Sequence, residues 1–471
     1  MTDRKTRPYT FYAMETAVCS TCLRRVEAKI LLEDERVLLR KWCPHHGFET
    51  VLLADDVAYW RRARERFLKP PEVPQRFQTP MKWGCPYDCG LCPDHQQHSC
   101  LTVVEITDHC NLACPVCYAE SGPHRPGHRD FETVLRMLDA VVASEGAPDV
   151  VQLSGGEPTL HPDFLRIVEA CRERPIRHLM VNTNGIRIAR DPAFVDSLVP
   201  FKKNFEIYLQ FDSLRDSVHQ HIRGAKLASI RQAALENLEA RGLSTTLVCT
   251  LQKGVNDDEI GAILEHALSF DCVRGVTFQP TQEAGRVDGY DPAVHRLTLT
   301  EVRRRILEAE QSPFTAADIV PVPCHPEVLA MGYALKLDGH VQPLTGLIPE
   351  DMLVSGSGNT VRFEGNPRVR GELDALFSTG IGPEGQAGKL GDVLCCLPKV
   401  EVGDLSYANI FRVMIVQFLD RRDLTVMNAK KSCVHFARPD GTIVPFDTFN
   451  VFYRDGKRAQ LDALRDEVLP S

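Results

Sequence analysis

Residues 101–280 alternate between short apolar runs and segments of helical periodicity, and this pattern constrains the fold most. Strands are predicted at 101–107, 149–154, 177–183, 205–211, 245–251 and 276–280. The clearest helix between them spans 131–145 and stops at Gly146. Strands separated by helices form right-handed βαβ units, which predicts an α/β fold with a parallel sheet. Beyond residue 290 the pattern is mixed, with a helix at 299–311 and a hairpin turn at Asp338-Gly339.

The fourth predicted strand indicates that the sheet encloses a polar interior. Its apolar residues alternate with the polar residues Glu206, Tyr208, Gln210 and Asp212. If the apolar set faces the surrounding helices, the polar set faces a lumen that is wet or filled by a ligand, because packed barrel interiors are apolar. Thr277 and Gln279 suggest the same orientation for the sixth strand.

The chain has 471 residues, 17 cysteines and a net charge of −8. The acidic balance argues against general nucleic-acid binding. No apolar run is long enough to span a membrane, and the N-terminal segment lacks the apolar stretch of a signal peptide. We therefore expect a cytoplasmic protein without a transmembrane segment. In that reducing compartment, clustered cysteines are typical of metal sites rather than disulfides.

Three cysteines follow the first predicted strand in a CxxxCxxC spacing, namely Cys110, Cys114 and Cys117. Three thiolates this close can hold three corners of a cubane iron–sulfur cluster and leave one iron open. Loops after parallel strands are also where α/β folds place their chemistry. We therefore expect these cysteines to be the catalytic ligands. A structural zinc loop, the alternative, would need a fourth ligand and would leave the next motif unexplained.

That motif is a GGEP turn after the second predicted strand. Gly155 and Gly156 let the backbone approach a ligand, and the carboxylate of Glu157 can bind an ammonium group, with Pro158 ending the turn. Polar residues end the following strands and are expected to bind a cofactor: Asn182, Asn184, Gln210 and Asp212. Arg223, in the sequence HIRG, either reaches a carboxylate or lies on the surface.

The combination of CxxxCxxC and GGEP resembles the radical S-adenosylmethionine (SAM) superfamily over about residues 101–280. The resemblance implies a partial (β/α)6 barrel in which the three cysteines bind a 4Fe–4S cluster. The open iron would chelate SAM, the GGEP turn would contact its amino group, and a reductant such as ferredoxin or flavodoxin would drive formation of a 5′-deoxyadenosyl radical. The family often has an aromatic residue before the third cysteine. Here that position is Val116, and Tyr118 after the cysteine is the expected cofactor contact.

Residues 1–80 are predicted to form a strand-poor domain with a metal knuckle and a proline-rich linker. Cys19, Cys22, Cys43 and His46 have the spacing of a tetrahedral ribbon site, with His45 as a rival for the fourth ligand. Three thiolates and one imidazole suit zinc, and a rubredoxin-like iron is the alternative.

Residues 81–100 repeat the cluster spacing at Cys85, Cys89 and Cys92. No GGEP-like turn accompanies this copy, so we predict an auxiliary cluster, which Cys100 would close unless His95 or His98 does. Residues 291–471 follow the barrel domain (101–290) as an extension with further expected ligands: Cys324, Cys395, Cys396 and Cys433. Their wide separation means that spacing alone does not define this site.

Over about residues 15–455 the chain resembles one branch of the superfamily, which contains tetraether lipid synthases and 6-hydroxymethylpterin methyltransferases. The resemblance rests on the motifs CPYDCGLCPDHQQH, EITDHCNLACPVCYAES, VTFQPTQEAGR and SCVHFARPDGTIVPF. This resemblance implies one or two auxiliary 4Fe–4S clusters and one tetrahedral zinc or iron. Asp447 stands where a cysteine is expected in many relatives, so the C-terminal cluster has other ligands or is absent.

The basic and aromatic segment 59–69 has two interpretations. It is either a helix lying on an anionic membrane, which would suit a lipid substrate, or a helix that packs the N-terminal knuckle against the barrel with a solvated basic face. We favour the second.

Four functions are compared. The first is a radical SAM enzyme that abstracts hydrogen from an unactivated C–H bond and forms a carbon–carbon bond between lipid chains, which we expect. A transferase that methylates a pterin or another small molecule is the second, and a peptide-modifying maturase the third. The fourth, an electron carrier, is disfavoured because it needs no open iron and no GGEP turn. A long apolar tunnel would indicate lipid, a compact polar pocket pterin, and an open edge strand peptide.

Overall fold

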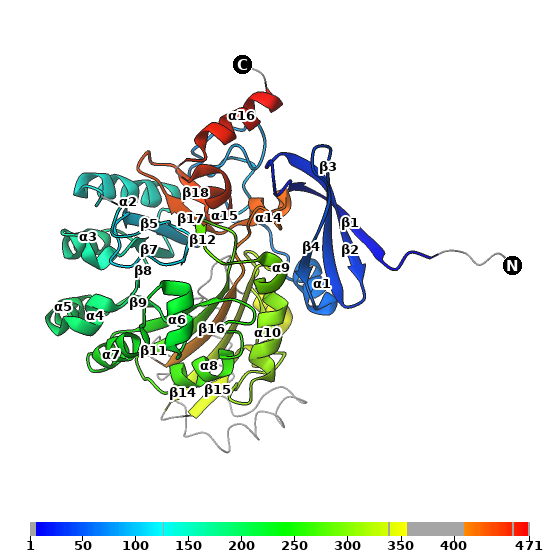
Figure 1. Cartoon of the computed structure of the whole chain (residues 1–471). Helices are drawn as coiled ribbons and strands as arrows, with labels where there is room; N and C mark the ends of the chain where they lie inside the picture. The colour runs from blue at the N-terminus through cyan, green and yellow to red at the C-terminus, as the bar shows by residue number, and fades with distance from the viewer. Residues whose placement is uncertain (1–5, 126, 338–339, 356–408, 455, 470–471) are drawn as a thin grey trace.

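The computed structural model describes residues 6–125, 127–337, 340–355, 409–454 and 456–469 (Figure 1). Its central feature is a mixed sheet that holds the barrel strands, with helices on the outer face. A separate four-stranded sheet lies at the N-terminus, on the opposite side from helices α2 to α5 in Figure 1. Among the helices of the described residues, none is long and apolar enough to cross a membrane.

Six parallel strands form the barrel, and each pairs with the next one along the chain. They are β5 (Leu101–Thr107), β7 (Val150–Gly155), β8 (His178–Thr183), β9 (Phe205–Gln210), β10 (Thr245–Leu251) and β11 (Val273–Pro280). The connecting helices are α2 (Phe131–Glu145), α3 (Phe164–Arg172), α4 (Ile186–Arg190), α5 (Pro192–Leu198), α6 (Asp216–Arg223), α7 (Ala228–Glu239) and α8 (Ile260–Leu268). The predicted α/β fold is therefore confirmed.

Helix α2 illustrates why the local sequence predicts these elements well. The carboxylate of Asp130 accepts a hydrogen bond from the backbone N–H of Thr133 and caps the first turn, and Gly146 ends the helix with a φ of 70°. Val134, Leu138 and others on the same face are buried in the core between helices and sheet. The capping aspartate, the terminating glycine and the apolar face are all signals that neighbouring residues in the sequence provide. The predicted bounds 131–145 therefore agree with the structure.

The alternation in β9 has the predicted consequence. Phe205, Ile207 and Leu209 are fully buried in the core on the helical side. Tyr208 and Gln210 line internal pockets on the other side. The barrel interior is thus polar on this strand, as its sequence predicts.

The C-terminal extension completes the barrel. β16 (Ile410–Val416) pairs in parallel with β11, and β17 (Val434–Ala437) pairs in parallel with β5. β14 (Leu329–Leu337) is antiparallel to β16 and forms the predicted hairpin with β15 (His340–Pro343); the turn lies outside the described residues. β18 (Ile443–Pro445) pairs with β17. Both edges of the six-stranded sheet are therefore occupied, and the outermost strands of the described sheet are the short β13 (Val320–Pro321) and β18.

The expectation of a strand-poor N-terminus is wrong. β1 (Thr10–Val18), β2 (Arg25–Glu33), β3 (Arg36–Cys43) and β4 (Gly47–Ala54) form an antiparallel sheet. In β2, buried Val26, Ala28 and Ile30 alternate with exposed Glu27 and Lys29. One face of β2 is covered and its exposed positions are charged, so the run does not stand out as apolar in the sequence.

Helix α1 (Val57–Glu65) packs this N-terminal sheet, with Tyr59 and Trp60 buried. Its basic residues pair within the protein: Arg62 with Glu350 at 2.8 Å, and Arg64 with both Glu15 and Glu327. Because the apolar side is covered and these charges are neutralised, the geometry favours the packing interpretation over a helix lying on a membrane.

Candidate active site

The loop after β5 brings the three predicted cluster cysteines to one pocket. Cys110, Cys114 and Cys117 line it together with Gly155 and Gly156. Burial raises the pKa of Cys110 to about 12. A cluster that binds the thiolate would offset this cost, because metal coordination requires the deprotonated sulfur. The donor set therefore fits three corners of a cubane cluster.

Arg286, which lies near the C-terminal end of the barrel domain in the sequence, holds the same loop. Its guanidinium donates to the carbonyl oxygens of Cys114 and, at 2.9 Å, of Ser121. A short strand, β12 (Arg286–Val287), also pairs with β6 (Val116–Cys117). The motif VTFQPTQEAGR contains this arginine, but sequence reasoning did not assign it a role.

The two glycines of the GGEP turn permit direct contact with the cysteine loop. The N–H of Gly156 donates to the carbonyl oxygen of Thr107 at 2.7 Å, and the N–H of Glu157 donates to that of His109 at 2.9 Å. A Cβ on Gly155 would lie 2.1 Å from the oxygen of Thr107, and one on Gly156 would lie 2.1 Å from that of His109. The turn thus fixes the loop that presents Cys110.

Glu157 and Pro158 are buried beneath the pocket and do not line it. The Glu157 carboxylate accepts hydrogen bonds from Thr183 Oγ1 and from the backbone N–H of Asn184, at 2.8 and 2.7 Å, and also from the hydroxyl and N–H of Thr159. In this arrangement Glu157 positions Asn184, whose Nδ2 lies 3.9 Å from Cys110 Sγ. The expected contact between Glu157 and the SAM ammonium group stays a prediction.

The remaining predicted cofactor residues form one continuous chain of hydrogen bonds. Tyr118 Oη and Asn182 Nδ2 both contact Ser154 Oγ at 3.2 Å. Gln210 Nε2 donates to Asn182 Oδ1 at 2.8 Å, and Arg223 donates to Gln210 Oε1 at 2.9 Å. Ser154 was not predicted. Its position at the end of β7, before the two glycines, is the only sequence signal for it.

Arg223 reaches a carboxylate, which was one of its two predicted interpretations. It binds both oxygens of Asp212 at 2.7 Å and also donates to Thr250 Oγ1 and the carbonyl oxygen of Val116. Burial raises the pKa of Asp212, but the Arg223 guanidinium more than offsets this and holds it below its usual value. The pair is therefore ionised and rigid at neutral pH.

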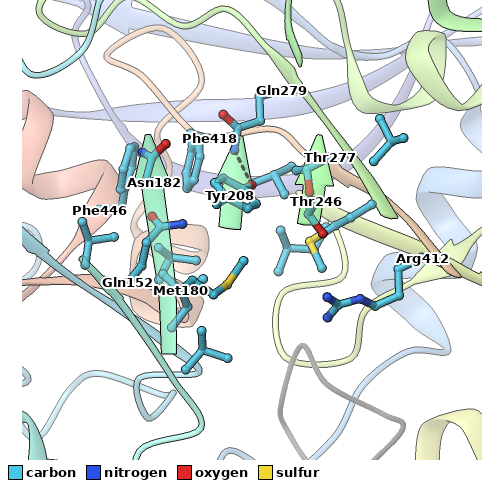
Figure 2. Close-up of a pocket in the computed structure, with 18 of the residues that line it drawn as sticks. Gln152, Met180, Asn182, Tyr208, Thr246, Thr277, Gln279, Arg412, Phe418 and Phe446 are labelled. Atoms are coloured by element: carbon cyan, nitrogen blue, oxygen red, sulfur yellow. Dashed lines mark hydrogen bonds between the residues drawn. The ribbon is translucent and has the colours of Figure 1, made fainter. Parts of the chain in front are cut away.

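A second chamber lies inside the barrel and adjoins the cysteine pocket (Figure 2). Tyr118, Asn182, Gln279 and Phe418 line both spaces. Further polar side chains point into the chamber, with Gln279 Nε2 donating to Tyr208 Oη at 3.1 Å. These additional side chains are Gln152, Thr246, Thr277 and Arg412.

The C-terminal extension supplies part of the chamber wall. Arg412 and Met414 come from β16, and Phe418 stacks on Phe446 with ring centroids 3.8 Å apart. Arg412 forms an ion pair with Glu206 at 3.0 Å, and burial raises the pKa of Glu206 while Arg412 lowers it to a net value below normal. The extension was predicted as a cluster domain, and its part in the barrel interior was not foreseen.

The N-terminal metal site is assembled as predicted. Ligand atoms of Cys19, Cys22, Cys43 and His46 all lie within 4.8 Å of one another. Cys22 Sγ and Cys43 Sγ are 3.9 Å apart, and a tetrahedral zinc ion with bonds of about 2.3 Å separates its sulfurs by about 3.8 Å. His46, not His45, supplies the imidazole nitrogen.

The structure regroups the other cysteines. Cys100, predicted to close the second motif, instead lies with Cys324 and Cys433 in a fully buried group. Cys324 Sγ and Cys433 Sγ are 3.4 Å apart, and His98 Nε2 lies 3.7 Å from Cys100 Sγ. Cys395 and Cys396 lie outside the described residues. Strand pairing brings these cysteines together. Cys433 directly precedes β17 and Cys100 directly precedes β5, and these two strands lie side by side in parallel.

Cys85, Cys89 and Cys92 line a small pocket of their own with His95. Burial raises the pKa of Cys89 to about 12. Asp447 accepts hydrogen bonds from the backbone N–H of Leu419 at 2.8 Å and from Ser432 Oγ at 3.0 Å. Asp447 thus makes a structural contact between the segments that carry Leu419 and Ser432.

Comparison with known proteins agrees with this geometry. Residues 104–267 match the Radical SAM superfamily, and residues 11–55 match the HMPTM N-terminal zinc ribbon domain. The chain is accordingly a radical SAM enzyme, a member of that superfamily, with a zinc-ribbon domain at its N-terminus.

Among individual proteins, the chain is similar to 7,8-dihydro-6-hydroxymethylpterin dimethyltransferase of Methanocaldococcus jannaschii, with 29% identity over 93% of each chain. It is 28% identical to GTP 3′,8-cyclase of Chlorobaculum tepidum over 38% of this chain and 53% of the cyclase. A solved structure, the FeFe-hydrogenase maturase HydG from Carboxydothermus hydrogenoformans, matches 46% of this chain and 52% of its own, with 15% identity and a TM-score of 0.38.

Proposed function

We propose that the protein is a radical SAM methyltransferase that forms a carbon–carbon bond on a pterin-like heterocycle. The relative named as a hydroxymethylpterin dimethyltransferase aligns along 93% of both chains, through the ribbon, the barrel and the extension. This similarity favours pterin methylation, the second of the four functions compared, over the lipid-joining reaction that we expected from the sequence.

The chamber next to the cysteine pocket is the structural observation that carries the proposal. Amide side chains of Gln152, Asn182 and Gln279 converge on it, and the rings of Phe418 and Phe446 form one wall (Figure 2). A pterin is a flat ring system whose edge carries several hydrogen-bond donors and acceptors. Apolar walls with a few convergent polar groups suit such a molecule.

The same chamber is less suited to lipid chains. An alkyl chain would have to pass polar groups along the lumen face of β9 and reach the wall formed by Arg412. Covering such groups without new hydrogen bonds costs about 1–3 kcal/mol each. A peptide added to the sheet edge is also disfavoured, because β16 and β17 occupy both edges of the six-stranded barrel sheet. The outermost strands of the described sheet, β13 and β18, are only two and three residues long and offer little edge for a peptide to pair with.

Each part of the site has a separate task in this proposal. Cys110, Cys114 and Cys117 hold the cluster, which together with bound SAM supplies the radical chemistry. The backbone of Gly155 and Gly156 and the side chains of Asn182, Asn184 and Gln210 orient the cofactor, while Tyr118 separates it from the chamber. Arg286 keeps the loop rigid.

Two further metal sites are proposed besides the zinc ribbon. Cys85, Cys89 and Cys92 hold an auxiliary iron–sulfur cluster. Cys100, Cys324 and Cys433 hold another metal centre, with His98 beside it. They would exchange electrons with the site or with a reductant such as ferredoxin or flavodoxin, which places the reaction in a reducing compartment such as the cytoplasm.

The test uses the anaerobically reconstituted holoenzyme with SAM and a chemical reductant. Incubation with 7,8-dihydro-6-hydroxymethylpterin should give a product heavier by one or two methyl groups, detected by mass spectrometry. The variant with all three cluster cysteines changed to alanine is the control and should give none. A chain-joined product from phospholipid, with no change in the pterin, would overturn the proposal and restore the lipid reaction.

A further inference from the structure

Cys100, Cys324 and Cys433 meet where the C-terminal extension closes the barrel. Cys100 directly precedes β5 and Cys433 directly precedes β17, two strands that lie side by side (Figure 1). The backbone N–H of Cys100 donates to the carbonyl oxygen of Cys433 at 2.9 Å. Cys324 joins them from the segment between β13 and β14, and all three side chains are buried. The group therefore lies at the start of β5, whereas the cysteine pocket follows its end.

The spacing of the three sulfur atoms indicates what they can bind. Ligand atoms of this group all lie within 4.8 Å of one another, and Cys324 Sγ and Cys433 Sγ are 3.4 Å apart. A single tetrahedral ion with bonds of about 2.3 Å separates its sulfurs by about 3.8 Å. In a cubane cluster each cysteine binds a different iron, so the ligand sulfurs are held farther apart. The spacing therefore fits one ion and does not fit a cluster.

The other cysteine groups of the chain provide the comparison. Within the part of the chain that the structure describes, the two CxxxCxxC loops, which are predicted to hold cubane clusters, do not reach this close spacing. The ribbon ligands do, namely Cys19, Cys22, Cys43 and His46. The group around Cys100 therefore resembles the single-ion site of the ribbon rather than a cluster loop.

His98 is placed to supply a fourth ligand to this group. Its Nε2 lies 3.7 Å from Cys100 Sγ, and a tetrahedral zinc ion separates a bound sulfur from a bound imidazole nitrogen by about 3.6 Å. Its Nδ1 donates to the carboxylate of Glu145 at 3.0 Å, and that side chain is 4% exposed. A carboxylate in this position fixes the tautomer, keeps Nε2 unprotonated, and is a usual outer partner of a metal-bound histidine.

The fourth position has one rival ligand. Glu72 Oε2 lies 3.8 Å from the same Nε2, but the Glu72 side chain is 54% exposed and that of His98 is 14% exposed. A carboxylate that leaves water for a buried site pays for its desolvation, which favours the imidazole. His98 is not among the atoms that all lie within 4.8 Å, so its imidazole must move toward Cys324 and Cys433 when an ion binds.

We propose that Cys100, Cys324, Cys433 and His98 bind a single tetrahedral ion, zinc or iron, and not an iron–sulfur cluster. The inference rests on the metal centre proposed above for these cysteines. It assigns the ligand set and the number of metal ions of that centre, and leaves the second CxxxCxxC motif as the one auxiliary cluster. It does not depend on the identity of the methyl acceptor.

The position of the ion gives it a structural task. Leu101 and Val434, the neighbours of Cys100 and Cys433, line the substrate chamber. An ion bound by both cysteines and by Cys324 would hold the barrel strand β5, the extension strand β17 and the segment before β14 in one geometry. Loss of the ion should therefore loosen the chamber without removing any residue that lines it.

The first test counts metal and sulfide in the anaerobically reconstituted full chain. Wild type and Cys324→Ser are compared by elemental analysis, acid-labile sulfide and native mass spectrometry. We expect the variant to lose one zinc or iron ion and no sulfide. Loss of about four irons and four sulfides would show a cubane cluster and overturn the proposal.

A disulfide is the remaining outcome of this comparison. If Cys324 and Cys433 were bonded to each other, their sulfurs would approach to about 2.05 Å and leave no site for an ion. The metal content of Cys324→Ser would then equal that of wild type, and denatured wild type would be lighter than its reduced form by two hydrogens. That result would also overturn the proposal.

The second test uses variants that leave the three buried cysteines in place. It is done in a His46→Ala background, which removes the ribbon ion, and measures the chelator concentration that extracts the remaining ion. His98→Ala should lose the ion at a concentration at least about 10-fold lower, and Glu145→Gln at one about 10- to 100-fold lower. His98→Cys supplies a thiolate and should retain the ion, because such sites also accept four cysteines.

Glu72→Gln is the matched control and should hold the ion as tightly as the background chain. Unchanged affinity in His98→Ala, or a loss in Glu72→Gln, would overturn the assignment of His98. These readouts need neither pterin nor phospholipid. A chain that methylates no pterin, but in which Cys324→Ser lacks one ion and no sulfide, would refute the proposed function and leave this inference intact.

Discussion

Single residues at the active site act mainly by fixing other groups. Gly156 allows the GGEP turn to touch the cysteine loop, and Glu157 accepts hydrogen bonds that position Asn184. Arg223 and Asp212 neutralise each other beside the pocket. Substitutions here are therefore expected to act through the geometry of the loop and the ionisation of its neighbours.

Gly156→Ala should remove the cluster. The new Cβ would lie 2.1 Å from the carbonyl oxygen of His109, so the loop carrying Cys110 must move. We expect a loss of about 1–3 kcal/mol in stability, as for overpacking, and of most of the iron bound there. Gly254→Ala, which has open space but a φ of 73°, is the control: it should cost about 1 kcal/mol and retain the iron. Full iron content in Gly156→Ala would contradict this prediction.

Arg223→Met should destabilise the metal-free protein in a pH-dependent manner. Breaking a buried ion pair costs about 3–5 kcal/mol. In wild type, Arg223 holds the pKa of Asp212 low, so this carboxylate contributes stability that is lost as the pH falls. In the variant the buried carboxylate has lost that cation, its pKa rises, and ionisation opposes folding.

The stability gap between wild type and Arg223→Met should consequently widen as the pH rises from about 4 to 7, measured by urea unfolding. A gap that stays constant with pH would mean that Asp212 does not titrate with the pair.

At the scale of elements, loops and strands bring distant ligands together. The turn between β3 and β4 carries Cys43 and His46 to Cys19 and Cys22. Pairing of β17 with β5 carries Cys433 to Cys100. The first case depends on neighbouring strands, and the second on segments more than 300 residues apart.

The two adjacent histidines of the ribbon allow a matched test. His46→Ala should lose the ribbon metal, one ion per chain, because His46 Nδ1 lies 3.4 Å from Cys19 Sγ and 3.5 Å from Cys43 Sγ. His45→Ala should retain it. Zinc and iron content by elemental analysis distinguishes the two, and equal metal loss in both variants would show that the ligand assignment is incorrect.

Cysteine variants should separate into two groups. Cys100→Ser and Cys324→Ser should lose the same metal centre, because both side chains belong to one buried group. Cys85→Ser should keep that centre and lose the auxiliary cluster proposed at Cys85, Cys89 and Cys92. Iron, sulfide and zinc contents together with Mössbauer spectra are the measurement. If Cys100→Ser matches Cys85→Ser instead, then Cys100 closes the second motif as its spacing suggests.

At the scale of the whole molecule, the extension is part of the active site rather than an attachment to it. Its strands occupy both barrel edges, and its side chains form a wall of the chamber. The chamber therefore exists only once residues beyond 400 have folded onto the barrel domain. Substrate binding in the chamber, as proposed above, would therefore depend on correct folding of the extension.

Phe418→Leu should uncouple SAM consumption from product formation. Phe418 borders both the cysteine pocket and the chamber, so a smaller side chain loosens substrate placement without removing a cofactor ligand. We expect about a 10-fold lower yield of product per deoxyadenosine formed, with stability reduced by less than about 1.5 kcal/mol. Phe449→Leu, in the same aromatic group but outside both pockets, should keep the wild-type ratio. An unchanged ratio in Phe418→Leu would contradict a role in placement.

The sequence by itself determined the features that depend on short-range pattern. Strand and helix alternation, the lumen face of β9, the CxxxCxxC loop and the ribbon ligands can all be identified because periodicity and close spacing are local properties. The N-terminal strands were missed, although their alternation is present, because a half-exposed strand is as polar as a loop.

Only the tertiary structure decided which distant groups meet. Cys324 and Cys433 are 109 positions apart and join Cys100, and the chamber wall comes from strands whose pairing no local signal encodes. The sequence likewise left open whether Arg223 reaches a carboxylate or lies on the surface. The structure pairs it with Asp212, because the side-chain partners of a buried group are set by the packed chain around it.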